Sequence, residues 1–407
     1  MQPQDSQDAP LLIKRLPLPE FITLLALLTS LVALSIDAML PALDVIGDEL
    51  NSASPQENFL IVSLFFGGMA VGQLFFGPFC DARGRRLTIL VGLIIFLLGT
   101  LICYLSTSME TLLLGRLVQA FGVSGPRIAS MALIRDLYVG DAMARVMSFI
   151  TVIFILVPMV APLIGQFVIQ LYGWRHIFTV FAIVTLISGA WFFTRQAETL
   201  PRQYRVKFNW FSFMRSLLFL VKHPVVMGAS IGMGSIFGAF LAYLSGSQTI
   251  FQSIYDTGEY FPLLFATLAF SIGAASFFNG VMVLKIGMIK LVSNAVVLTL
   301  IFAIVLTAIS LFYNGKPPLW LFVTTMFIGF FFIGILFGNL NSLAMEPVGH
   351  IAGVGAAFIG SFTSLMAVPI GIFIGQFLDT SVTPIAIGFT VFGFVTLIAV
   401  RIAVKQK

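Results

Sequence analysis

Twelve apolar runs follow one another along the chain, and each is long enough, at about 20 residues, to cross a bilayer as an α-helix. Membrane-spanning β-strands instead alternate in polarity over about ten residues, a pattern that these runs do not have. The sequence therefore predicts an all-α integral membrane protein with twelve transmembrane helices. The runs cover approximately 21–43, 57–80, 86–106, 110–133, 146–170, 176–194, 225–246, 260–284, 290–313, 319–344, 351–377 and 383–404.

Composition narrows the class of protein further. Of the 407 residues, 10% are charged and 59% are hydrophobic, whereas a soluble protein has about 25% charged residues. This balance excludes a soluble enzyme, a disordered chain and a nucleic-acid-binding protein, and it makes the lipid bilayer the expected environment. No nucleotide-binding loop, metal-ligand spacing or nucleophile–His–Asp order is visible, so the sequence predicts no catalytic group, no metal and no cofactor.

The distribution of basic residues predicts the orientation in the membrane. If the N-terminus faces the cytoplasm, 18 of the 22 Lys and Arg lie in inner segments, and the outer loops carry two, Arg175 and Lys316. Cytoplasmic loops are enriched in Lys and Arg. We therefore expect both termini to be cytoplasmic.

The longest inner connection, 195–222, divides the spans six and six. Its second part, from Asn209 to Phe219, has the pattern of an amphipathic helix on the membrane surface. Ile164–Phe167 recurs 210 residues later as Ile374–Phe377, and parallel six-helix repeats are typical of transporters with a midplane site. The expected organisation is a cytoplasmic segment 1–20, a six-helix half 21–194, a cytoplasmic central loop 195–222 and a six-helix half 223–407.

Three charged residues, Asp37, Arg116 and Arg127, lie clear of the loops inside predicted spans. A charge in hydrocarbon costs several kcal/mol, so each is a functional candidate. Asp37 and Arg116 lie at matching depths near the outer boundary, which suggests a carboxylate–guanidinium pair between neighbouring helices. Such a pair would serve proton or substrate coupling, or it would be a static structural ion pair.

Arg127 follows Arg116 by 11 residues, which is about three helical turns plus 20°, so the two share one helix face. We expect that face to line an aqueous path, with Arg127 contacting substrate or protons near mid-depth. The alternative is a hydrogen bond from Arg127 to carbonyls of a neighbouring helix. Gln119, on the same span, is a further candidate for the substrate cavity. With Asp37 matched to Arg116, the cavity would be positive and would favour neutral or anionic compounds.

The hairpin after the second span resembles the inner-loop signature of the major facilitator superfamily, G-x-x-x-D-x-x-G-R-[KR]. In that family this hairpin is a latch that holds the two halves closed on the inner side. We expect Gly84 to permit a tight turn and Arg85 to reach Asp136 at the inner end of span four. The residues of this gating motif are Gly77, Asp81, Arg83, Gly84, Arg85, Arg86 and Asp136.

Two further motifs resemble those of the same family. Arg116 to Gly122 is similar to R-x-x-Q-G-x-G, with Ala120 in place of a Gly, and the resemblance implies a role for Arg116 in proton coupling. Span five resembles the antiporter signature G-P-x-x-G-G, in which Ala161 and Gln166 replace two glycines. The candidate antiporter residues are Pro158, Ala161, Pro162 and Gly165.

Four strings, at 34–43, 134–138, 173–178 and 198–201, resemble the bicyclomycin-resistance and chloramphenicol-efflux group of bacterial drug:proton antiporters. The resemblance implies an inner-membrane protein that exports small, mostly apolar compounds in exchange for protons, with Asp37 as the proton carrier. We expect it to act as a monomer. The alternatives are a proton-coupled importer of a small nutrient with the same fold, and a membrane sensor or channel without coupled transport.

Overall fold

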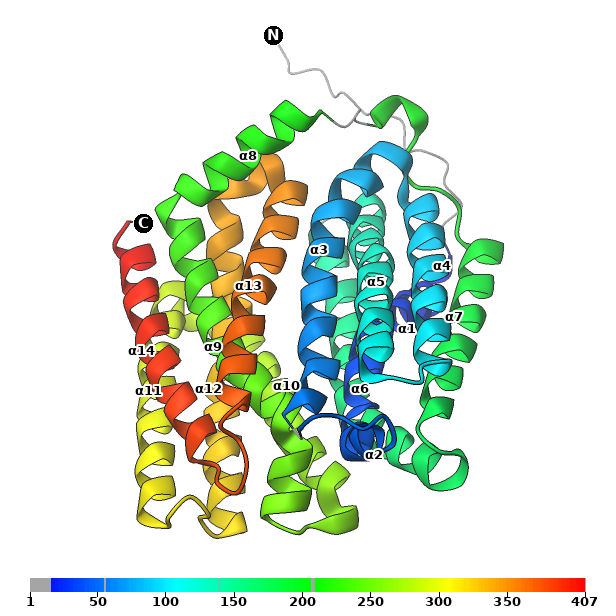
Figure 1. Cartoon of the computed structure of the whole chain (residues 1–407). Helices are drawn as coiled ribbons and strands as arrows, with labels where there is room; N and C mark the ends of the chain where they lie inside the picture. Colours follow the sequence, from blue (N-terminus) through cyan, green and yellow to red (C-terminus); the bar gives the residue numbers. More distant parts are fainter. Residues whose placement is uncertain (1–15, 55, 139, 206–208, 407) are drawn as a thin grey trace.

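The computed structural model describes residues 16–54, 56–138, 140–205 and 209–406, so most of the predicted segment 1–20 lies outside the described residues. Figure 1 shows long helices standing side by side in two groups, with α8 across one end. The helices are α1 (Leu18–Asp37), α2 (Leu43–Glu49), α3 (Leu60–Arg83), α4 (Arg85–Tyr104), α5 (Met109–Leu137), α6 (Gly140–Tyr172), α7 (Arg175–Arg195), α8 (Trp210–Lys222), α9 (Pro224–Gln248), α10 (Phe261–Ile286), α11 (Met288–Phe312), α12 (Leu319–Met345), α13 (Ala352–Gly375) and α14 (Thr383–Lys405).

The prediction of an all-helical membrane fold is confirmed. Eleven helical segments in the described part of the chain are long and apolar enough to cross a membrane. The one remaining predicted span, 146–170, falls on the 33-residue helix α6. The central connection contains the predicted amphipathic helix as α8, where Asn209 accepts hydrogen bonds from the first backbone amides, and where Trp210 and Phe211 are exposed.

Helices α1–α7 pack on one another, and α9–α14 pack on one another; we call these the first and second bundles. They join chiefly through the pairs α3–α13 and α6–α10. The α3–α13 pair stays in contact along its length. Phe59 packs on Gly375 at one end, the Ser361 hydroxyl donates to the Ala70 carbonyl at 2.7 Å, and Asp81 lies against Gly353 at the other.

The start of α1, the end of α14 and α8 lie toward the same end of the molecule, the upper end of Figure 1. We call this the termini end and its opposite the far end. The termini end holds the turn between α3 and α4 and the turn between α10 and α11. Gly84, with φ +102°, and Gly287, with φ +85°, make these turns. Left-handed backbone favours glycine, which has no Cβ, so the predicted tight turn at Gly84 is confirmed, and it has a counterpart in the second bundle.

The first predicted span ends earlier than expected. Helix α1 stops at Asp37 and a 3₁₀ turn, Leu40–Ala42, follows before the short α2. Pro41 lies in this turn, and proline cannot donate the backbone hydrogen bond that would continue the helix. The break leaves Asp37 as the last residue of α1, at the far end of the first bundle.

Close packing between α4 and α5 fixes the direction in which α5 presents its polar residues. A Cβ atom on Gly92 would lie 2.7 Å from the Gly122 carbonyl oxygen, and one on Gly99 would overlap the backbone of Gln119. Small residues let membrane helices approach this closely. The two α5 arginines consequently extend toward α3, Arg116 to Ile61 and Arg127 to Met69.

Candidate functional site

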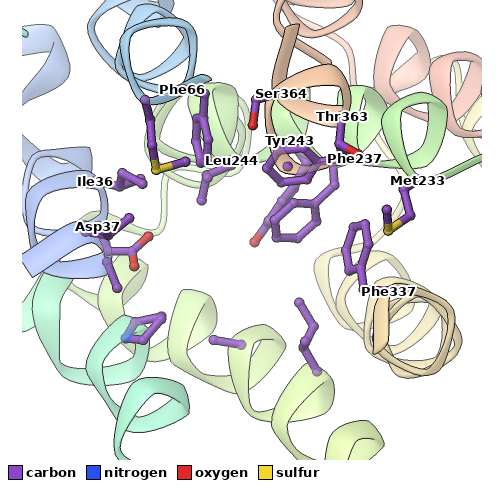
Figure 2. Close-up of a pocket in the computed structure, with 18 of the residues that line it drawn as sticks. Ile36, Asp37, Phe66, Met233, Phe237, Tyr243, Leu244, Phe337, Thr363 and Ser364 are labelled. Atoms are coloured by element: carbon purple, nitrogen blue, oxygen red, sulfur yellow. The ribbon is translucent and has the colours of Figure 1, made fainter. Parts of the chain in front are cut away.

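A cavity of about 480 Å³ lies between the two bundles. Its wall is formed by α1, α3, α5 and α6 on one side and by α9, α10, α12 and α13 on the other. This volume is in the range of sites that bind drug-sized molecules. Figure 2 shows its side chains converging on an open centre.

The second bundle supplies an aromatic wall. The Phe240 ring lies 5.3 Å from Phe330, the Tyr243 ring lies 4.8 Å from Phe330, and Phe237 lies 5.8 Å from Phe337, measured between centroids. Edge-to-face pairs of this kind are favourable beyond the apolar area that they bury. The wall therefore offers rigid, flat surface for an apolar or aromatic compound.

The first bundle supplies the charged groups of the cavity. Asp37 is 5% exposed, and its carboxyl group enters the cavity from α1 (Figure 2). Within the described part of the chain it has no hydrogen bond and no ion pair from its side chain. Arg127 is exposed to the cavity and donates from Nη1 to the Met69 sulfur at 3.2 Å, which is a weak acceptor. The structure thus places Arg127 beside the cavity, as the sequence predicts.

The predicted pair between Asp37 and Arg116 is wrong. Arg116 is fully buried behind α1, where Nη2 donates to the Ser35 carbonyl at 2.9 Å and Nε to the Ile61 carbonyl at 3.1 Å. Its guanidinium also lies 4.3 Å from the centroid of the Phe65 ring. The depths match as expected, since Ser35 is two residues before Asp37, but the Asp37 side chain lines the cavity and Arg116 does not. Arg116 therefore does not line the expected aqueous path.

The placement of Gln119 in the substrate cavity is also wrong. Gln119 is fully buried between α4 and α5, where it accepts from Arg116 at 2.6 Å and donates to Thr100 at 2.8 Å. A chain of bonds thus runs from Thr100 through Gln119 and Arg116 to the backbone of α1. These residues hold the end of the helix that carries Asp37.

The gating motif forms an ion-pair network at the termini end. Arg85 donates to Asp136 at 2.9 Å and to Asp81 at 3.0 Å, and it also donates to the Cys80 carbonyl at 2.9 Å. The predicted contact between Arg85 and Asp136 is confirmed. The Asp81 carboxylate lies beside Gly353 near the start of α13, where a helix N-terminus attracts negative charge.

The other residues of the motif surround this network. A Cβ atom on Gly77 would lie 3.2 Å from that of Ala357 on α13. Arg86 donates to the Phe193 carbonyl at 2.8 Å, and Arg83 is exposed. The motif therefore faces the second bundle through Gly77 and Asp81 and faces α7 through Arg86.

The connection after α7 completes the network, a role that the sequence did not reveal. The Glu198 carboxylate accepts from the backbone amides of Arg85 at 3.0 Å and Arg86 at 3.1 Å, at the start of α4. Thr199 donates to Asp136 at 2.7 Å. An acid at a helix N-terminus satisfies otherwise unpaired amides. Glu198 and Thr199 belong to one of the strings of the resemblance, but nothing in the string gives the distance to the hairpin.

The antiporter residues line the contact between α6 and α1. Pro158 lines the cavity, and Ala161 and Pro162 are buried. Gly165 faces the backbone of Ala38, and a Cβ atom there would overlap the Ala38 carbonyl oxygen. This motif thus touches the chain next to Asp37.

Hydrogen bonds between the bundles close the far end of the cavity. The Ser63 and Ser245 hydroxyl groups lie 3.2 Å apart, and Gln248 donates to the Pro41 carbonyl and accepts from the Asp44 amide, each at 3.3 Å. Toward the termini end, the cavity residues Arg127 and Asn341 are exposed. The cavity is therefore reached from the termini end. The sequence did not predict these hydrogen bonds, because Ser63, Ser245 and Gln248 are polar residues of ordinary type.

Residues 25–371 match the Major Facilitator Superfamily. The chain is 32% identical over 350 residues to the MFS-type transporter YdgK of Bacillus subtilis, covering 84% of this chain and 85% of that protein. It is 31% identical over 349 residues to a bicyclomycin resistance protein homolog of Haemophilus influenzae, with the same shares.

The fold resembles the crystal structure of a D-xylose-proton symporter with a TM-score of 0.75, over 95% of this chain and 99% of that one, at 13% identity. At this identity the likeness concerns the fold alone. The family match covers most of the chain, and the cavity and the motif network lie within it. The chain belongs to the Major Facilitator Superfamily, and it is a multi-pass membrane transporter rather than an enzyme.

Proposed function

We propose that this chain exports small, mostly apolar compounds from the bacterial cytoplasm across the inner membrane in exchange for protons. One observation carries the proposal: Asp37 presents a carboxyl group, without a cationic partner among the described residues, to a largely apolar cavity between two helix bundles. The relative named for bicyclomycin resistance supports a drug as cargo.

Export against a gradient requires that proton and cargo bias the protein in opposite senses. Asp37 is suited to this task because its charge is the one that changes when a proton binds. An ionised carboxyl group in an apolar cavity is unfavourable, so it favours a state in which water reaches it. Cargo in the cavity and a proton on Asp37 would then compete with each other, because both act on the same conformational equilibrium of the protein.

We propose that the halves 21–194 and 223–407 move as units joined by the connection 195–222. The excess of basic residues at the termini end supports its cytoplasmic location. The contacts of Ser63 with Ser245 at the far end and of Asp81 with Gly353 at the termini end are both present in this structure, and we propose that the far-end contact breaks when the cavity opens to that side. One chain holds a complete cavity, which supports a monomer as the working unit.

Transport in inside-out membrane vesicles tests the proposal. Radiolabelled bicyclomycin should accumulate in vesicles that contain the chain when their lumen is made acidic, and nigericin, which collapses the pH gradient, should abolish it. Vesicles from the same host without the chain are the control. Gradient-driven loss of bicyclomycin from the lumen would instead favour the importer. Movement that is independent of the pH gradient would favour a channel.

A further inference from the structure

Tyr243 on α9 carries a buried hydroxyl group with no hydrogen-bond partner in the described part of the chain. The residue is 1% exposed and lines the cavity, and its ring is held edge-on against Phe330, with centroids 4.8 Å apart. Buried hydroxyl groups nearly always have a partner, because an unpaired one is costly. We therefore expect the hydrogen-bond partner of the Tyr243 hydroxyl to be a molecule bound in the cavity.

Tyr243 and Asp37 belong to different bundles and enter the cavity from opposite sides (Figure 2). Both residues line the same cavity. A carboxylate can only accept hydrogen bonds, whereas a phenol hydroxyl can donate one. The two groups together offer one acceptor and one donor that face the same space.

A neutral amide has the complementary pair, because its N–H donates and its carbonyl accepts. We propose, building on the function above, that the cargo carries an amide-like donor–acceptor group, which Asp37 and Tyr243 hold between them. The apolar or aromatic remainder of the cargo lies on the wall formed by Phe237, Phe240, Phe330 and Phe337. Tyr243 is thus a specificity-determining residue supplied by the second bundle.

Tyr255 gives the matched comparison. Its hydroxyl is also buried and without a partner among the described residues, but Tyr255 follows α9 at the far end and does not line the cavity. A lost hydroxyl at Tyr255 reports the general effect of removing a buried phenol oxygen. The difference between the two positions isolates the contribution of the cavity.

The experiment measures equilibrium binding to the purified full chain in detergent. The probes are chloramphenicol, a neutral aromatic amide, and tetraphenylphosphonium, an aromatic cation without hydrogen-bonding groups. Tyr243→Phe should raise the Kd for chloramphenicol about five- to tenfold, as expected for one lost hydrogen bond. The Kd for tetraphenylphosphonium should stay unchanged. Tyr255→Phe should leave both unchanged, and thermal melting should show that all three proteins are folded.

Three results would overturn the inference: an unchanged Kd for chloramphenicol in Tyr243→Phe, an equal loss for both probes, or no binding of chloramphenicol by the wild type. The outcome is separable from the proposed function. Binding that depends on Tyr243, without gradient-driven uptake in vesicles, would support the site and contradict proton-coupled export. Gradient-driven export of bicyclomycin, together with chloramphenicol binding that is indifferent to Tyr243, would contradict the site alone.

Discussion

Gly165 on α6 lies directly against the backbone carbonyl of Ala38, so closely that no side chain fits between them. Ala38 follows Asp37, so this contact fixes the position of the carboxyl group that we propose as the proton carrier. We therefore expect the candidate antiporter motif to act on Asp37 through backbone packing, because Gly165 has no side chain with which to act chemically.

Replacement of Gly165 by Ala should displace the end of α1. Overpacking of this kind costs about 1–3 kcal/mol, so we expect a lower melting temperature in detergent and impaired gradient-driven uptake. Gly67→Ala is the matched control, because Gly67 is also helical and its Cβ position is empty within 4 Å. A Gly165→Ala protein with wild-type melting and uptake would show that α1 can shift without consequence.

Asp37→Asn should abolish proton exchange while the protein remains folded, because an amide has a shape similar to that of a carboxyl group but does not bind and release a proton near neutral pH. The measurement is proton release into weakly buffered detergent solution when chloramphenicol is added to the purified protein. Asp48→Asn, at an exposed position on α2, is the control and should release protons as the wild type does. Undiminished release from Asp37→Asn would assign the carrier to another residue.

Arg116 should prove irreplaceable by Lys, because it acts through the shape of its guanidinium group. It binds two backbone carbonyls and Gln119 at once, and an ammonium group lacks that planar fork. Each charge-assisted hydrogen bond lost costs about 1.5–3 kcal/mol, so Arg116→Lys and Arg116→Gln should both melt well below the wild type. If charge alone mattered, as for a counter-ion of Asp37, Arg116→Lys would behave as the wild type.

Glu198 should matter to the gate as much as the motif residues do. Glu198→Ala leaves the first amides of α4 without their acceptor, and Arg85→Ala removes the links to Asp81 and Asp136. Both should slow uptake more than they weaken cargo binding, because the network acts on the equilibrium between states. Initial rates and Kd values are compared with those of Arg202→Ala, an exposed neighbour in the same connection. Equal rates in all variants would exclude a gating role.

The sequence predicts the positions of some of these residues and not of others. Hydropathy predicts the twelve helices because a bilayer imposes their length, and the spacing of Gly84, Arg85 and Asp136 predicts a turn and an ion pair that the structure contains. Position along the helices predicts that Asp37 and Arg116 lie at similar depths, and Arg116 indeed binds the Ser35 carbonyl, two residues before Asp37. It does not predict the side of α1 to which Asp37 points, because that depends on how α1 packs between α6 and α5.

The residues that the sequence missed are ones whose role arises only between distant segments. Glu198 is an ordinary loop acid until the fold brings it to the start of α4, 112 residues away in sequence from Arg86. Tyr243 is one of eight tyrosines, and its unpaired hydroxyl is defined only by what surrounds it. Neither could be recognised from composition or spacing.

The corrected position of Asp37 changes the prediction for Arg127. Because Arg116 does not neutralise Asp37, the cavity holds one acid and one base, rather than the net positive charge expected from the sequence. Removing the base in Arg127→Ala leaves the acid alone, which should raise export of tetraphenylphosphonium relative to chloramphenicol. Arg127→Lys keeps the charge and should retain the wild-type ratio, whereas Arg127→Gln, which keeps only hydrogen bonding, should behave as Arg127→Ala does. The ratio of the two uptake rates in inside-out vesicles measures the effect independently of expression level. An identical ratio in all four proteins would show that the Arg127 charge is not felt by the cargo, and its contact with Met69 would then be structural.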